Sequence, residues 1–226
     1  MLNHSSLHHY ILSYILEKGH APELDQLSQH FSVNKEEMTE ALEALQEYHG
    51  VVLHPNQAKV WVIHPFSLAP TNFLVESARG SWWGNCAWCS LGVAALLKED
   101  VTIKTSNGAY GDALYMHIKD GELVEKDLWV HFPIPMRNAW DNVIYTCTTM
   151  LLFRNKEEID QWSQRHNIPK GDIQPAENIW NFSKKWYGNH LNPEWVKWTG
   201  EEAKSMFKEF GLIHPVWDLD GGKERF

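Results

Sequence analysis

Residues 81–98 constrain this chain more than any other segment, because they bring two of its three cysteines together with three of its twelve tryptophans. These cysteines are Cys86 and Cys89, and the third, Cys147, lies in a second apolar segment at residues 143–153. The reactivity of a thiol depends on its thiolate character and its accessibility rather than on packing. Three thiols confined to two apolar segments therefore predict a thiol site.

Composition places the chain among globular proteins with a buried core. It has 226 residues, of which 43% are hydrophobic and 22% charged, and this allows one large domain or two small ones. The formal net charge of −9 repels phosphate backbones and argues against nucleic acid as the main partner. Residues 1–10 contain no basic region followed by an apolar run, and no apolar run reaches 18 residues, so neither a signal peptide nor a membrane span is expected. We expect a cytoplasmic protein whose cysteines stay reduced and form no disulfide framework.

The first part of the chain is predicted to be helical. Apolar residues recur at helical spacing in three stretches, and the third begins with a capping-box pair, Asn34 and Glu37. Residues 51–54 and 59–63, separated by a turn, are typical of a β-hairpin. Three helices followed by a two-stranded wing predict a winged-helix-like module over residues 1–64, which serves either to bind DNA or as a scaffold.

DNA binding by this module is not expected. Its third helix carries Glu36, Glu37, Glu40, Glu43 and Glu47 against a single lysine, Lys35. Contacts to phosphates supply most non-specific affinity, and acidic side chains oppose them. We predict that the protein does not bind duplex DNA in the submicromolar range at physiological salt, which a filter-binding titration over several salt concentrations would check.

The second predicted domain spans residues 65–226. Residues 64–72, a stretch with two prolines, suit a linker at its start. Residues 73–76 are predicted to form a strand, and residues 90–98 a short helix. Cys89 would then stand at a helix N-terminus, where the helix dipole favours a thiolate and lowers the thiol pKa.

Beyond that helix the apolar residues alternate with a period of two, which is typical of an antiparallel sheet. The predicted strands are residues 101–105, 113–118, 128–132 and 143–153. The last has no charge in its eleven residues and is expected to be a buried central strand with Cys147 at its middle.

The C-terminal part is predicted to be helical. Residues 156–166 form one helix, and further helices start near Pro175, Pro193 and Thr199. Five of the twelve tryptophans fall within residues 180–217, where we expect them to pack helices onto the sheet, with a cover over a pocket as the alternative. The predicted fold is α+β: a winged-helix-like module, then a small mixed or antiparallel sheet flanked by helices, with a helical C-terminal extension.

Several of these motifs together resemble the organomercurial (alkylmercury) lyase family. They are residues 88–91 (Trp-Cys-Ser-Leu), residues 147–153 (Cys-Thr-Thr-Met-Leu-Leu-Phe) and the helix at 159–166, and the resemblance covers roughly residues 5–166. It implies that Cys89 and Cys147 bind the mercury of R–Hg–X.

In that family an aspartate three residues after the first cysteine helps to protonate the leaving carbon, but here Gly92 stands at that position. This chain therefore resembles a divergent member of the family. Cys86, at Cys-x-x-Cys spacing from Cys89, is the predicted third ligand or replacement proton donor. Restoring the carboxylate with Gly92→Asp is expected to raise lyase activity.

The resemblance implies a small organometal, or another soft electrophile, as substrate. Mercury(II) or another soft metal is then substrate and product, and no resident cofactor is expected. Three other functions remain open: a soft-metal binder without turnover, a thiol enzyme with another substrate, and a metal-responsive regulator.

The cysteines also allow three unrelated kinds of site. One is a redox Cys-x-x-Cys motif. Another is a structural zinc site completed by a histidine such as His117 or His131. The third is a cysteine–histidine acyl-transfer site, for which no motif identifies the base.

Overall fold

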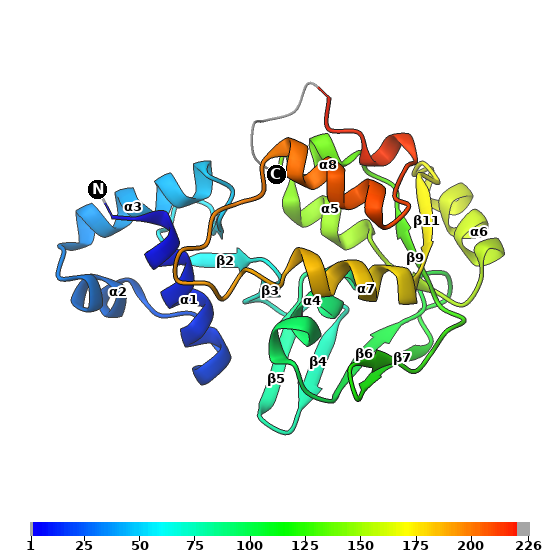
Figure 1. Cartoon of the computed structure of the whole chain (residues 1–226), viewed down its shortest axis with the longest axis horizontal. Helices are drawn as coiled ribbons and strands as arrows, with labels where there is room; N and C mark the ends of the chain where they lie inside the picture. The colour runs from blue at the N-terminus through cyan, green and yellow to red at the C-terminus, as the bar shows by residue number, and fades with distance from the viewer. Residues whose placement is uncertain (1, 221–226) are drawn as a thin grey trace.

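The computed structural model describes residues 2–220 and has the α+β architecture that the sequence predicts. Figure 1 shows the N-terminal helices at one end of the molecule, with the later helices lying against the sheets at the other. Among the described residues, no helix is long and apolar enough to cross a membrane.

The N-terminal elements follow the predicted order. Helices α1 (His4–Lys18), α2 (Leu24–Phe31) and α3 (Lys35–Glu47) precede the antiparallel strands β1 (Val52–Leu53) and β2 (Val60–Ile63). The predicted capping box at the start of α3 is present, with both reciprocal hydrogen bonds formed. The three helices and the hairpin are thus confirmed, whereas their assignment as a winged helix stays a prediction.

The hairpin continues into a larger sheet. Strand β3 (Phe66–Ser67), inside the segment predicted as a linker, pairs with β2 on one side and with β5 (Gly80–Gly84) on the other. The resulting sheet has eight strands in the order β1-β2-β3-β5-β4-β6-β7-β8, all antiparallel to their neighbours. The indole N–H of Trp82 donates to the carbonyl of Ile15 in α1 at 3.0 Å. Sheet pairing therefore crosses the predicted domain boundary at residue 64, and the segment after it does not act as a free linker.

The remaining strands of this sheet are β4 (Leu74–Ser77), β6 (Val101–Ser106), β7 (Ala113–Lys119) and β8 (Glu122–Leu123). A second sheet places β9 (Trp129–Phe132) between β10 (Leu152–Phe153) and β11 (Asp172–Pro175). The strands predicted at residues 73–76, 101–105, 113–118 and 128–132 are confirmed to within a residue or two.

The strand predicted over residues 143–153 is wrong. This segment forms α5 (Val143–Thr149) and only afterwards the short strand β10. The side chain of Asn142 caps α5 by accepting a first-turn backbone N–H at 3.0 Å. A charge-free run fits a buried helix as well as a buried strand, so its pattern could not distinguish the two. Cys147 consequently lies on a helix and not in the middle of a strand.

Helix α4 (Ala87–Leu97) is the centre of the core. It starts three residues before residue 90, where the sequence predicts the helix to begin. Ten of its eleven residues are buried. It contacts β3, β4 and β5 on one side and α7 (Ala176–Trp186) on another. A helix that is apolar all round is stable in water only when it is enclosed in this way.

The C-terminal helices are partly as predicted. Helix α6 (Lys156–His166) has the expected bounds, α7 follows Pro175, and α8 (Gly200–Glu209) begins at the predicted Thr199 capping box. The helix expected near Pro193 is wrong, because residues 193–198 form turns and irregular chain. Short 3-10 turns occur at Met136–Asn138 and Pro215–Trp217.

One buried histidine in this fold generates a pH prediction. Burial in β9 lowers the pKa of His131 to about 4, from an ordinary value of 6.5. The unfolded chain then binds the proton more readily, so the stability that His131 contributes above pH 6.5 is lost as the pH falls from there towards 4. We expect the free energy of unfolding to decrease by about 1.4 kcal/mol per pH unit for this group.

Urea denaturation of the parent and of His131→Gln at several pH values between 7.5 and 4.5 would measure this contribution. In the variant, the free energy of unfolding should fall less steeply with decreasing pH, because unfolding takes up about one proton fewer. Identical slopes in the two proteins would contradict the assignment.

Candidate functional site

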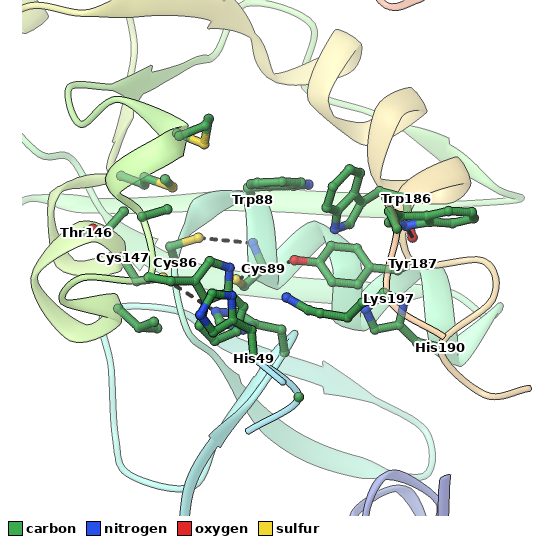
Figure 2. A pocket seen from close by; sticks show the side chains of 18 of the residues that line it. His49, Cys86, Trp88, Cys89, Thr146, Cys147, Trp186, Tyr187, His190 and Lys197 are labelled. Carbon is green, nitrogen blue, oxygen red and sulfur yellow. Dashed lines mark hydrogen bonds between the residues drawn. The ribbon is translucent and has the colours of Figure 1, made fainter. Parts of the chain in front are cut away.

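A pocket lies where the start of α4 meets α5 and the chain that joins α7 to α8, and all three cysteines line it (Figure 2). Cys86, Cys89 and Cys147 are 1%, 2% and 6% exposed, and the structure places all three as free thiols. The pocket is small, with a cavity volume of about 70 Å³.

Cys86 and Cys89 are held by the first turn of α4. Cys86 is the N-cap residue, and its Sγ accepts the backbone N–H of Cys89 at 3.2 Å. Oxygen side chains usually fill this role, so a sulfur at the N-cap is unusual. Cys89 therefore stands at a helix N-terminus, as the sequence predicts.

Cys147 faces Cys89 across the pocket, as expected from the sequence. The two sulfurs and a ring nitrogen of His64 all lie within 4.8 Å of one another, and His64 Nε2 is 3.9 Å from Cys147 Sγ. A soft metal with bonds of about 2.3 Å, the zinc–thiolate length, spans about 4.6 Å between two sulfurs. The three groups therefore form a potential metal-binding set. Sequence analysis missed His64, which is one of thirteen histidines and lies in the presumed linker.

The thiols differ in acidity. Burial raises the pKa of Cys89, but hydrogen bonds from Cys147 and Cys86, the charge of His64 and the hydroxyl of Tyr187 outweigh it, and the pKa falls well below the ordinary value. Burial raises the pKa of Cys86, and hydrogen bonds to Cys86 and Cys89 raise that of Cys147. Of the three thiols, Cys89 is therefore the one most disposed to lose its proton.

Tyr187 occupies the space beside Gly92. A Cβ added at Gly92 would lie 2.5 Å from Tyr187 Cδ2 and 2.9 Å from Pro65 Cβ, distances that real Cβ atoms do not reach. The phenol oxygen of Tyr187 in turn lies 3.6 Å from Cys89 Sγ. Gly92 is thus covered by an aromatic ring, so a side chain at this position requires the ring to move. The gain in lyase activity expected from Gly92→Asp stays a prediction.

The wall opposite the cysteines comes largely from the C-terminal part. Trp186, Trp195 and Trp198 line the pocket, while α7 also packs on α4. The tryptophan-rich segment therefore both packs the core and covers a pocket, which combines the two predictions made for it. Lys197 lies in the same wall, 8% exposed, with its Nζ 3.8 Å from the centre of the Trp140 ring.

Neither histidine considered for a zinc site joins the cysteines. His117 lies on β7, and its Nδ1 is hydrogen-bonded to Glu125 Oε1 at 2.6 Å. His131 packs against Phe153 and Trp162. The histidine that does approach the sulfurs is His64. A zinc site built with His117 or His131 is therefore excluded by their positions.

Comparison with known families identifies the domain. The alkylmercury lyase family model, MerB, matches residues 66–188, more than half of the chain. The chain belongs to the alkylmercury lyase family. The matched region of this lyase-like chain includes all three cysteines and Tyr187 but ends before Lys197.

A solved structure shares the fold. The mercury-bound form of MerB2 superimposes with a TM-score of 0.65 at 16% sequence identity, covering 84% of this chain and 98% of that one. A comparison of the sequence with curated proteins finds no match. The resemblance in the sequence to the alkylmercury lyases is thus confirmed for both family and fold.

The contact between Gly92 and Tyr187 leads to a stability prediction. Gly92→Ala is expected to lower the free energy of unfolding by about 1–3 kcal/mol, since it overpacks the contact between α4 and α7. In a Tyr187→Ala background the same change should cost at least about 1 kcal/mol less, because the obstructing ring is gone.

Urea denaturation of the two single variants and the double variant would complete this cycle. Additive effects would contradict the close contact between the two positions.

Proposed function

We propose that this protein cleaves the carbon–mercury bond of small organomercurials, with Cys89 and Cys147 as the sulfur pair. The observation that carries the proposal is the meeting of these two buried sulfurs within 4.8 Å of each other, in a chain of the alkylmercury lyase family. Thiolates are the ligands that soft metals prefer. Mercury is substrate and product here, and the proposal includes no resident cofactor.

The acidities suggest an order of events. The Cys89 thiolate attacks mercury in R–Hg–X and displaces X⁻, giving R–Hg–S. Cys147 then forms the second S–Hg bond as it loses its proton, and the C–Hg electron pair passes to carbon, which is protonated to RH. Cys147 loses one proton and the carbon gains one, so protons balance in this step. The balance is unchanged if a third group passes the proton from Cys147 to the carbon.

Cys86 is the proposed relay. Burial raises its pKa, so the thiol keeps its proton. Its Sγ also accepts the backbone N–H of Cys89 at 3.2 Å, which holds it in the same helix turn as that thiol. It would protonate the carbon and recover the proton that Cys147 gives up, which agrees with the role inferred from the sequence. Service as a third metal ligand is the other role open to Cys86.

Tyr187 is the second candidate for the relay, favoured by the 3.6 Å between its hydroxyl and Cys89 Sγ. Burial, followed by the charge of Cys89, raises the pKa of Tyr187 well above its ordinary value, so the hydroxyl keeps its proton. Its ring also covers Gly92, the position that carries the acid in the family.

Capture of a soft metal without turnover is the second candidate function. The observation that favours it is Gly92, which supplies no carboxylate, together with His64 as a third potential ligand. Either function requires reduced thiols, and we therefore propose a cytoplasmic location.

Single-turnover release of hydrocarbon from an alkylmercury thiolate tests the lyase proposal. Cys89→Ser and Cys147→Ser each remove a soft donor and should abolish both tight mercury binding and hydrocarbon release. Stoichiometric mercury uptake by the parent without hydrocarbon release would instead identify the binding function.

The same assay separates the two candidate relays. Cys86→Ser should retain substantial mercury binding but slow bond cleavage by about 10²-fold or more, the usual scale for losing a general acid. Tyr187→Phe, which keeps the ring over Gly92, should change the rate much less. A slow Tyr187→Phe variant beside a fast Cys86→Ser variant would assign the relay to Tyr187 instead.

A further inference from the structure

A second cavity lies beside the pocket that contains the three thiols, the cysteine pocket, and Cys147 lines both. The second cavity is lined by residues of β2, of the connection from β3 to β4 and of α5, together with Asn85. Its volume is about 220 Å³, against about 70 Å³ for the cysteine pocket. A molecule in this larger space would therefore lie against one of the two residues proposed to hold mercury.

The second cavity contains a buried amide without a partner. Asn85 is 5% exposed, and its Nδ2 makes no hydrogen bond within the described part of the chain. A buried polar group that lacks a partner is costly, so a position of this kind needs an explanation. A side-chain amide can turn about its last bond to present either its N–H groups or its oxygen. The Asn85 amide is thus suited to pair with a polar group that a ligand brings.

The remaining walls of the second cavity offer a ligand no opposite charge. Trp61 and Phe73 supply aromatic surface, and Thr71 and Thr148 already donate their hydroxyl protons to backbone carbonyls. No aspartate, glutamate, histidine, lysine or arginine is among the described residues that line this space. A charged ligand would lose its hydration here without gaining an ion pair. The cavity therefore suits a small uncharged molecule that carries an amide.

The place of Cys147 in the wall indicates what such a molecule can do. Mercury held by two buried thiolates leaves the protein when another soft donor replaces them. The cysteine pocket, at about 70 Å³, is too small to take a second organic molecule beside the metal. The second cavity has the room and reaches one of the two sulfur-bearing residues, so it is suited to an incoming thiol.

We propose that the second cavity binds an uncharged thiol that carries an amide, and that this thiol removes mercury from Cys147. Its sulfur bonds to mercury as the bond between mercury and Cys147 Sγ breaks, and its proton passes to that Sγ. A second thiol replaces Cys89 in the same way, so atoms and charge balance without an oxidant or a reductant. The inference rests on the proposed capture of mercury by Cys89 and Cys147, which both candidate functions share, and not on cleavage of the carbon–mercury bond.

Release of radioactive mercury(II) from the loaded protein tests this site. The release rate is measured by rapid gel filtration at increasing concentrations of 3-mercaptopropionamide and, separately, of 3-mercaptopropionate, its charged analogue. A binding site makes the rate saturate with the amide thiol, whereas simple collision between thiol and metal gives a linear dependence. The carboxylate thiol should need about a tenfold higher concentration for half-saturation, because the cavity offers it no opposite charge.

Two variants test whether the site is the second cavity. Asn85→Leu removes the amide at nearly constant volume and should raise the half-saturating concentration of the amide thiol by about fivefold or more. The same variant should unfold at no lower denaturant concentration than the parent, since the lost amide has no partner, whereas a structural role for Asn85 would lower it. Ala69→Phe fills the cavity from another wall and should abolish saturation. Asn181→Leu is the matched control, because this half-buried asparagine of α7 lines neither cavity, and it should respond as the parent does.

The outcomes distinguish this inference from the lyase proposal. Saturating release that depends on Asn85, in a protein that frees no hydrocarbon from alkylmercury, supports the thiol site and refutes cleavage. Hydrocarbon release together with a linear dependence on thiol, or with an equal response to the two thiols, supports cleavage and overturns the thiol site. Unchanged half-saturation in both Asn85→Leu and Ala69→Phe would also overturn the site, and so would a parent protein that takes up no mercury.

Discussion

The enclosure of α4 is the constraint on which the rest of the structure depends. Ten of its eleven residues are buried, so the sheet must cover one side and α7 another. The helix therefore carries its N-terminal cysteines, Cys86 and Cys89, into the interior with it. Removal from water is what makes their acidity differ, because a low dielectric strengthens each hydrogen bond and charge interaction between neighbouring thiols.

Close packing also explains the surroundings of residue 92. Helices approach most closely where a glycine removes a side chain from the contact, and Gly92 allows the Tyr187 ring to lie directly on α4. In this chain a phenol fills the space beside the sulfurs, with its oxygen 3.6 Å from Cys89 Sγ. A side chain added at residue 92 alone would therefore meet the Tyr187 ring, since the two positions are packed as a pair.

The sequence predicted those features whose signals are local. The α3 capping box, the bounds of α6 and the Thr199 start of α8 depend on residues within one turn of each other, and all are confirmed. Residues 143–153 failed because an uncharged run has no periodicity to separate a helix from a strand, and only the Asn142 cap marks the helix start.

The site was predicted only as far as its cysteines. Their rarity and apolar surroundings indicated Cys89 and Cys147, and the family resemblance supplied their pairing. His64, Tyr187 and Lys197 reach the pocket from distant parts of the chain, and the fold alone brings them together. No spacing in the sequence distinguishes them from other histidines, tyrosines or lysines. The rest of the site therefore depended on knowing the three-dimensional structure.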